Sequence, residues 1–323
     1  MNAPSRRRTS LIILSAIVLL AVGVTVGTTM ARSSDDGVPP VAALPGAAGM
    51  GEIELLVADL APMVEFYAGG VGLEVIEQTS ETAVLGADGE ALVRLVRAPG
   101  LGTDDPGEAG LYHSAFLFAD ASELASAVVR VATASPEAFQ GASDHTVSNA
   151  FYFADPEGNG VELYVDLPRD TWTWTDGRVT MGTYALDPNA FLAEHLPASG
   201  PTLAATGVAM GHVHLRGGDV DAAERFYVDV IGMAVTSRID SAVFLSAGGY
   251  HHHLAVNTWS SAGAGERPEA LGLGHVTVTV PDAATVDAVE ARAVAAGAVH
   301  ERTVDGLTVL DPWGTQVVVR VAA

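Results

Sequence analysis

The chain has 323 residues, with 39 acidic and 16 basic side chains, and its formal net charge at pH 7 is −23. A surface this acidic repels phosphate backbones, so we expect no binding to nucleic acid. The chain has no cysteine, which excludes disulfides, thiolate metal ligands and a cysteine nucleophile. Any metal would therefore be held by His, Asp or Glu, a set of donors that favours Fe(II), Mn, Ni or Zn.

The first 32 residues have the pattern of an export signal or a single membrane anchor. Three arginines, Arg6 to Arg8, precede an apolar segment that runs from Leu11 to about Gly27. The positive flank should stay in the cytoplasm, which would place the rest of the chain outside it. We expect an apolar helix here, and contact with a membrane only through this segment. Residues 33–49, rich in Ser, Asp, Pro, Gly and Ala, predict a flexible linker.

The rest of the chain contains a fourfold repeat, and each copy begins a module. The four starting segments are MGEIELLVAD (50–59), LYHSAFLFAD (111–120), MGHVHLRGGD (210–219) and LGHVTVTVPD (273–282). In each, an acidic or histidine residue is followed seven positions later by Asp, and the apolar residues between them predict a β-strand. The Asp suits an N-cap because a helical pattern follows it. Further strand-like segments with tight turns come next, so each module is predicted to be βαβββ.

The spacing of the modules divides the chain into two halves. Modules 1 and 2 would occupy residues 50–164 and modules 3 and 4 would occupy residues 208–323. The intervening 165–207 would be a crossover linker that contains a short helix at Pro188–His195. The fold class predicted from these alternating elements is α+β.

Two positions recur in the repeat where metal ligands could lie. The first holds Glu52, His113, His212 and His275 in modules 1 to 4. The second, four residues past a turn glycine, holds Val93, Glu162, His253 and Val318. If modules 2 and 3 close one cup, four potential ligands meet there, whereas sequential pairing spreads the ligands over two cups. We favour the pairing of modules 2 and 3 because it places a complete site in one cup.

The segment GGYHHHLAVNTW (248–259) contains three consecutive histidines. Adjacent residues of a strand face opposite ways, so all three cannot bind one ion. The repeat selects His253 as a fourth ligand, a slip of one residue would select His252 instead, and His251 would line the pocket. His214 lies two residues beyond His212 and is a further pocket-lining candidate. We interpret His275 as vestigial or structural.

The phrases GHVHLRGGDVDAAERFYVDVIGM, FYFADPEGNGVELYVD and GGYHHHLAVNTW resemble the vicinal oxygen chelate superfamily, which includes glyoxalase I, fosfomycin-resistance and bleomycin-binding proteins. The four-module layout, over about 50–323, most resembles its catechol 2,3-dioxygenase-like extradiol branch. The resemblance implies paired modules that form two open eight-stranded cups, with Fe(II), Mn(II) or another divalent metal held by two His and one carboxylate. By position these ligands are His113, His212 and Glu162. The best-known extradiol enzymes take their ligands from the last two modules, where this chain has Val318 at the carboxylate position.

The resemblance implies a metal-dependent extradiol ring-cleaving dioxygenase that acts on a catechol-like aromatic molecule and O2, and the N-terminal segment predicts that it is exported or membrane-anchored. A homo-oligomer is compatible with this expectation. The reaction needs an acid–base group, for which His145, His214 and Tyr250 are the candidates. Two alternatives remain open, a glyoxalase-like metal-dependent lyase or isomerase and a non-catalytic small-molecule-binding protein. A fourth ligand from His253 would favour isomerase or hydrolase chemistry, because it would leave only two open positions on the metal.

Overall fold

The computed structural model describes residues 43–322, which lie within one compact unit, Asp35–Ala323. The predicted export or anchor segment at 1–32 therefore lies outside the described residues, as does most of the predicted linker. Within the described part of the chain, no helix is both long enough and apolar enough to cross a membrane. This part has the predicted α+β character, with two large sheets of mixed strand direction.

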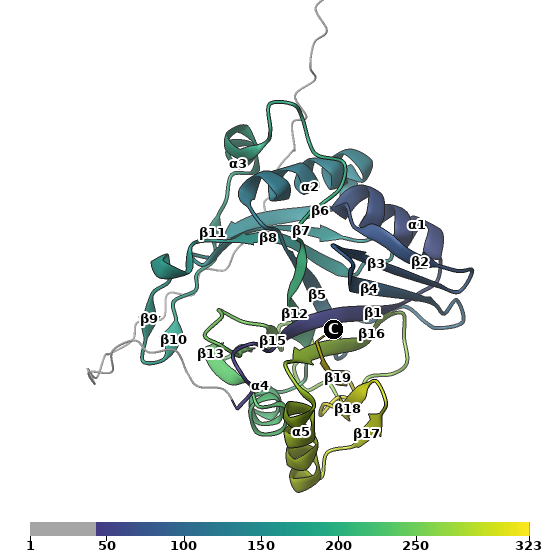
Figure 1. Ribbon diagram of the computed structural model, residues 1–323, viewed down its shortest axis with the longest axis vertical. Helices are drawn as coiled ribbons and strands as arrows, with labels where there is room; N and C mark the ends of the chain where they lie inside the picture. The colour runs from purple at the N-terminus through teal and green to yellow at the C-terminus, as the bar shows by residue number, and fades with distance from the viewer. Residues whose placement is uncertain (1–42, 323) are drawn as a thin grey trace, which may run out of the picture. The chain divides into compact units, whose positions relative to one another are not determined.

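Modules 1 and 4 together form an eight-stranded sheet in the order β17-β18-β19-β16-β1-β4-β3-β2 (Figure 1). Its strands are β1 (Gly49–Val57), β2 (Glu74–Gln78), β3 (Thr82–Ala87), β4 (Glu90–Arg97), β16 (Gly272–Val280), β17 (His300–Thr303), β18 (Gly306–Leu310) and β19 (Gln316–Val321). The two modules meet where β1 pairs antiparallel with β16. We call this the module 1–4 sheet.

Modules 2 and 3 form the second sheet, in the order β11-β6-β7-β8-β5-β12-β15-β14-β13. Its strands are β5 (Gly110–Leu117), β6 (Phe139–Asp144), β7 (Ser148–Ala154), β8 (Gly160–Asp166), β11 (Tyr184–Ala185), β12 (Ala209–Arg216), β13 (Ala234–Ile239), β14 (Ala242–Ser246) and β15 (Leu254–Asn257). This topology confirms the pairing of modules 2 and 3. The sheet has nine strands instead of the eight expected, because β11 of the crossover adds to the edge strand β6.

The helices begin where the repeated Asp residues predicted them. They are α1 (Leu60–Val64), which continues as the π-helix η1 (Glu65–Val71), α2 (Ala121–Ala134), followed by η2 (Pro136–Ala138), α4 (Val220–Arg225), which continues as the π-helix η4 (Phe226–Ile231), and α5 (Ala283–Ala296). The carboxylates of Asp59, Asp120, Asp219 and Asp282 each accept a hydrogen bond from a backbone N–H in the first turn. Each cap satisfies a donor that would otherwise lack a partner and so marks the start of the helix.

The helices join the modules in a different combination from the sheets. Helix α2 packs against η1, and α5 packs against η4, so modules 1 and 2 contact each other and so do modules 3 and 4 (Figure 1). A buried hydrogen bond repeats this arrangement in each half. Tyr67 donates to Asp155 at 3.0 Å, and Tyr227 donates to Asp311 at 3.2 Å. Each module is therefore tied to one neighbour by its sheet and to another by its helix.

The crossover packs beside the module 2–3 sheet. It comprises η3 (Arg169–Thr171), β9 (Trp174–Thr175), β10 (Arg178–Val179), β11 and α3, which spans Pro188–His195 as predicted. Trp172 and Val179 of this segment form a small buried cluster with Val147 and Tyr250. The crossover is thus attached to both modules of the sheet.

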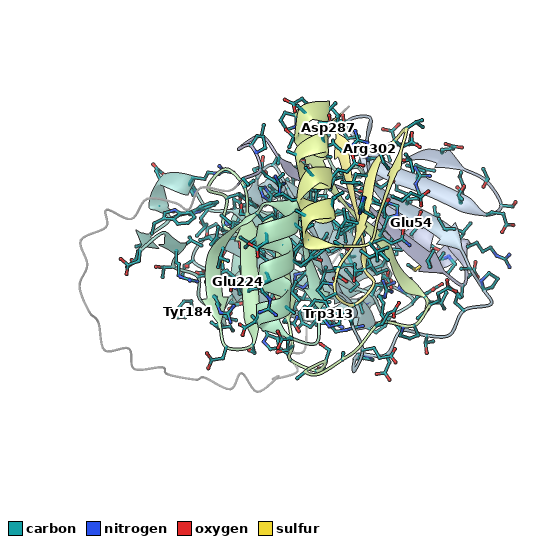
Figure 2. The ribbon with its side chains drawn as sticks, turned by 90° about the horizontal axis from the view of Figure 1, so that it is seen from below. Glu54, Tyr184, Glu224, Asp287, Arg302 and Trp313 are labelled. Atoms are coloured by element: carbon teal, nitrogen blue, oxygen red, sulfur yellow. The ribbon has the colours of Figure 1, made fainter. Side chains whose placement is uncertain are left out.

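Alternation along the strands separates an apolar face from a polar one. Phe116 of β5 and Leu163 of β8 lie in the main hydrophobic core, whereas Ala115 and Tyr164 belong to a separate cluster. This is the period of two expected of strands with different environments on their two faces. At the surface, Arg302 of β17 pairs with Asp287 of α5, with Nη2 and Oδ1 at 2.9 Å (Figure 2).

Candidate metal centre

Three side chains from three neighbouring strands converge on the polar face of the module 2–3 sheet. His113 comes from β5, Glu162 from β8 and His212 from β12. Glu162 Oε2 lies 3.0 Å from His113 Nε2 and 3.2 Å from His212 Nε2, and the two imidazole nitrogens are 3.4 Å apart. All three side chains are buried. The structure therefore brings together three of the four ligands predicted from the sequence.

The strand register explains this convergence. Ala115 of β5 pairs with Glu162 of β8 on one side and with His212 of β12 on the other. A bulge at Gly211 shifts the register of β12 just before His212. A Cβ atom at Gly211 would lie 1.8 Å from Tyr164 Oη, so no larger residue fits there. The glycine of the MGH phrase thus leaves room for the Tyr164 side chain beside β12.

The protonation of this cluster suits metal binding. Burial tends to raise the pKa of Glu162, but the facing imidazoles of His212 and His113 outweigh it and hold that pKa well below its ordinary value. Burial lowers the pKa of His212 to about 4. Near neutral pH the carboxylate is therefore ionised and His212 is neutral, which is the form in which each group donates electrons to a metal.

The residues also fit a metal in their spacing. Ligand atoms about 2.1 Å from a metal and at right angles to one another lie about 3 Å apart. The three separations in the cluster, 3.0, 3.2 and 3.4 Å, are close to that value. Two imidazoles and one carboxylate on one face are the donors of the facial triad, which leaves further metal positions open. Among residues 43–322, these three side chains form the group that could hold a metal ion, with their ligand atoms within 4.8 Å of one another.

His253 lies outside this cluster, contrary to its prediction as a fourth ligand. Its Nδ1 accepts from the Ala247 N–H at 3.2 Å, and its ring stacks on Tyr250. The strand β15 begins only at Leu254, so strand alternation does not govern the three histidines. The strand register shows which residue of β15 corresponds to Glu162. Glu162 pairs with Ala115, two residues beyond His113. Ala255 pairs with His214, two residues beyond His212, so Ala255 and not His253 occupies the equivalent position. Counting from the turn glycine failed because the loop before β15 is longer.

The other two histidines of that segment form a chain of polar contacts. His252 packs on the ring of His212, with centroids 4.2 Å apart, and its Nδ1 lies 2.8 Å from His251 Nδ1. His251 Nε2 lies 3.0 Å from Asp166 Oδ1. His252, not His253, is therefore the residue of this segment that faces the metal cluster. Asp166, the last residue of β8, ends this series of polar contacts.

Tyr250, predicted as an acid–base group, lies instead in a buried packing cluster. Its hydroxyl lies 2.7 Å from Tyr164 Oη and donates to Asp166 at 3.2 Å. Burial and the charge of Asp166 raise the pKa of Tyr250 well above its ordinary value. With both its ring and its hydroxyl engaged, Tyr250 has a structural role on the side of Tyr164.

His145 lies near the cluster through a tyrosine that the sequence did not single out. Its Nδ1 is 2.7 Å from the carbonyl oxygen of Gly182, so this nitrogen must carry the proton. Its Nε2 is 2.6 Å from Tyr152 Oη. Tyr152 pairs directly with Glu162 across the β7–β8 hairpin, and its ring lies 5.8 Å from that of His113. The hairpin turn could have revealed Tyr152, because counting outward from DPEGNG pairs it with Glu162.

His214 points to the same face and is held by an amide. Asn257 Oδ1 accepts from the backbone N–H of Trp259 at 3.1 Å, which fixes the orientation of the amide. Asn257 Nδ2 therefore donates to His214 Nε2, at 3.1 Å. The His214 ring lies 5.0 Å from that of His113. The structure thus places His145 and His214, but not Tyr250, around the ligands.

The equivalent place in the module 1–4 sheet carries different chemistry. Glu54 pairs with Arg94 there, as Ala115 pairs with Glu162 in the other sheet. Arg94 Nε donates to Glu52 at 3.0 Å, and His275 Nδ1 lies 3.4 Å from Glu54. A guanidinium therefore stands where the other sheet has its carboxylate. This supports the interpretation of His275 as a structural residue.

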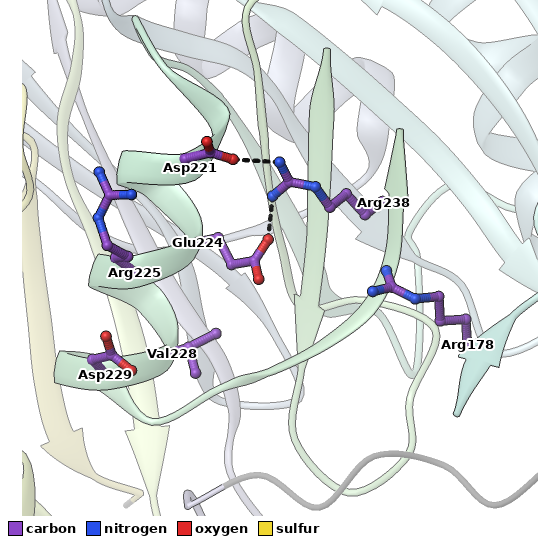
Figure 3. Close-up of a pocket in the computed structure, with 7 residues that line it drawn as sticks. All are labelled: Arg178, Asp221, Glu224, Arg225, Val228, Asp229 and Arg238. Carbon is purple, nitrogen blue, oxygen red and sulfur yellow. Dashed lines mark hydrogen bonds and ion pairs between the residues drawn. The ribbon is translucent and has the colours of Figure 1, made fainter. Parts of the chain in front are cut away.

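A surface hollow of about 490 Å³ lies between α4 and the crossover (Figure 3). Its lining is mostly charged and consists of Arg178, Asp221, Glu224, Arg225, Val228, Asp229 and Arg238. Arg238 forms ion pairs with both Asp221 and Glu224. None of the lining residues belongs to the metal cluster, and we assign the candidate site to the cluster because its chemistry is specific.

Comparison with known proteins agrees with this architecture. Catechol-2,3-dioxygenase from Bacillus subtilis strain 168 is 35% identical over 269 residues, which cover 81% of this chain and 93% of that protein. A solved structure of a B. subtilis protein assigned as a dioxygenase has a TM-score of 0.59 at 14% identity and covers 84% of each chain. Glyoxalase I from Zea mays has a TM-score of 0.53 at 18% identity, over 85% of this chain and 92% of that one. Both solved structures therefore share the fold of this chain.

The family model of the glyoxalase/bleomycin resistance protein/dioxygenase superfamily matches residues 49–163 and 209–319. The first range contains modules 1 and 2, and the second contains modules 3 and 4. The matched ranges, the relative at 35% identity and the two-sheet architecture lead to one assignment. The chain belongs to the glyoxalase/bleomycin resistance protein/dioxygenase superfamily.

Proposed function

We propose that the protein is a metal-dependent dioxygenase that cleaves the ring of a catechol-like substrate beside one of its hydroxyl groups. The observation that carries this proposal is the convergence of His113, Glu162 and His212 from three strands. The relative at 35% identity, a catechol-2,3-dioxygenase, supports it. Iron(II) is the metal that we propose, with Mn(II) as the alternative, because a facial set of two His and one carboxylate suits these ions.

The chemistry that such a metal supplies when bound is chelation of both vicinal oxygens and electron transfer from the ring to O2. The number of protein ligands matters for this reaction, since three ligands leave room for three substrate atoms. Because His253 hydrogen-bonds elsewhere, the structure offers no support for the fourth ligand that would favour an isomerase. The ring-cleaving reaction is therefore preferred over the glyoxalase-like alternative.

Residues of the chain would manage the protons of the reaction. Tyr152 donates its hydroxyl proton to Nε2 of His145, since Nδ1 of that histidine already donates to Gly182. This pair can take up a proton from a catechol hydroxyl and later return it. His214, held by Asn257, presents a second imidazole on the same face. We assign proton transfer to Tyr152 with His145, and orientation of the substrate to His214.

Oxygen uptake with 4-methylcatechol tests this proposal. Protein loaded anaerobically with Fe(II) should consume O2 and one equivalent of substrate, because both oxygen atoms enter the product. Glu162→Ala should lose both metal and uptake, whereas His253→Ala, the matched control, should keep the metal. A protein that binds iron stoichiometrically at His113, Glu162 and His212 yet consumes no O2 would refute the dioxygenase.

We also propose that the globular part lies outside the cytoplasm, either exported or held by the N-terminal segment. The support is the sequence alone, with Arg6 to Arg8 before the apolar segment from Leu11. Protease added to intact cells that expose the outer face of their membrane should degrade the globular part. Protection until the membrane is lysed would contradict this location.

A further inference from the structure

Tyr112 breaks a pattern that the other three modules keep. The residue just before the first repeated position is Gly51, Gly211 and Gly274 in modules 1, 3 and 4, but Tyr112 in module 2. All four residues lie at register shifts between the first strands of paired modules. A bulge leaves one residue without a partner and changes the direction of its side chain. In module 2 alone, that residue has a large side chain to direct.

The bulge turns the Tyr112 ring toward the candidate metal centre. Its centroid lies 5.3 Å from that of His113 and 4.9 Å from that of His214. Strand alternation would have sent adjacent residues Tyr112 and His113 to opposite faces. Gly160 of β8 accommodates the bulge, because a Cβ there would lie 2.1 Å from the Tyr112 carbonyl oxygen.

Trp259 completes an exposed aromatic pair with Tyr112. The two rings meet edge to face with centroids 5.1 Å apart, and Trp259 also contacts His214 at 5.3 Å. Trp259 Nε1 donates to Ser241 Oγ at 3.0 Å, and its backbone N–H donates to Asn257. Tyr112 is 41% exposed and Trp259 is 48% exposed. Both rings are thus fixed in direction yet leave much of their surface uncovered.

We propose that Tyr112 and Trp259 form the wall against which the aromatic ring of the substrate packs, so that they determine which ring sizes are accepted. This inference rests on the proposed function and specifies the substrate as a planar aromatic ring chelated through vicinal oxygens. Aromatic rings pack edge to face or offset, and each such contact strengthens binding beyond the area it buries. A site that only chelated a small aliphatic diol would gain nothing from two exposed rings.

The test measures binding of 4-methylcatechol by calorimetry to metal-loaded protein without O2. Tyr112→Ala and Trp259→Ala should each raise the Kd about tenfold, while metal content stays unchanged. Tyr112→Phe keeps the ring and should restore affinity. Tyr112→Ala should also bind the larger 2,3-dihydroxynaphthalene better relative to 4-methylcatechol. Tyr184→Ala is the matched control, because Tyr184 is 61% exposed on the edge strand β11 (Figure 2).

The outcomes separate the two proposals. A Kd that stays within twofold in both Tyr112→Ala and Trp259→Ala overturns the aromatic wall, as does wild-type protein that does not bind the catechol. If both variants weaken binding but wild-type protein consumes no O2 in a parallel electrode measurement, the wall stands and the dioxygenase fails. Because Trp259 is about half exposed, its variant keeps the test valid should Tyr112→Ala fold poorly.

Discussion

At the scale of single residues, the site depends on which hydrogen-bond donors are already committed. The carbonyl of Gly182 fixes the proton of His145 on Nδ1, which leaves Nε2 to accept from Tyr152. Burial raises the pKa of Tyr152 well above its ordinary value, and the nearby charge of Glu162 raises it further. Tyr152 is therefore a phenol with its proton held toward an acceptor, beside the metal ligands.

We predict that Tyr152→Phe lowers kcat for catechol cleavage by about 10²- to 10⁴-fold, the usual contribution of a positioned acid–base group. Metal content and the Kd for 4-methylcatechol should change little, because the ring remains in place. Steady-state kinetics with metal analysis measure both quantities. Unchanged kcat would show that the hydroxyl has no part in proton transfer.

At the scale of the elements, the repeat made several features predictable and concealed others. The repeated Asp residues predicted the starts of the helices, and the equivalence of His113, His212 and Glu162 in the repeat predicted the three side chains that converge as candidate ligands. The position of His253 could not be derived, because a longer loop broke the count from the turn. The bulge at Tyr112 could not be predicted either. It depends on the register between β5 and β12, which belong to different modules, and the sequence of one strand does not determine that register.

The Asp-Pro turns that follow the third strands of modules 2 and 4, β7 and β18, also set a pH dependence of stability. Burial raises the pKa of Asp155 to about 6 and that of Asp311 to about 6, against an ordinary value of 3.8. Each accepts backbone N–H groups of its own turn and the hydroxyl of Tyr67 or Tyr227. Because the folded pKa is raised, the stabilising contribution is complete below about pH 4 and is lost as pH rises through about 6.

We predict that Asp155→Asn removes this loss. A shift of about two pKa units corresponds to about 3 kcal/mol, so the free energy of unfolding should fall less in the variant than in wild type between pH 4 and pH 7. Urea unfolding at a series of pH values measures the difference, and Asp311→Asn should behave alike in the other half. A variant whose pH dependence matches wild type would contradict the raised pKa.

At the scale of the whole molecule, two sheets with the same topology in their module strands have different polar side chains at equivalent positions. The module 2–3 sheet has His113, Ala115, Glu162 and His212 where the module 1–4 sheet has Glu52, Glu54, Arg94 and His275. The Arg94 guanidinium supplies a fixed positive charge to Glu52. The pairing of modules could be predicted only because the ligands were so unevenly distributed, since hydrophobic periodicity is the same in all four modules.

The wild-type chain should therefore bind one metal ion, in the module 2–3 sheet. The triple variant Glu52→His, Glu54→Ala, Arg94→Glu copies the metal-binding pattern into the other sheet, with His275 as the remaining ligand. We predict that it binds about two equivalents of metal, as measured by elemental analysis after gel filtration. A folded variant that still binds one equivalent would show that the two sheets are not equivalent in geometry.

The central claim is that a metal held by His113, Glu162 and His212 directs both atoms of O2 into a cleaved aromatic ring. Mass spectrometry of the product formed from 4-methylcatechol under isotopically labelled O2 tests it most directly. We predict one ring-opened product that contains both labelled atoms, formed by iron-loaded wild-type protein and absent with Glu162→Ala. A ring-opened product without the label, or recovery of the catechol intact, from protein that holds its full equivalent of iron would contradict the claim.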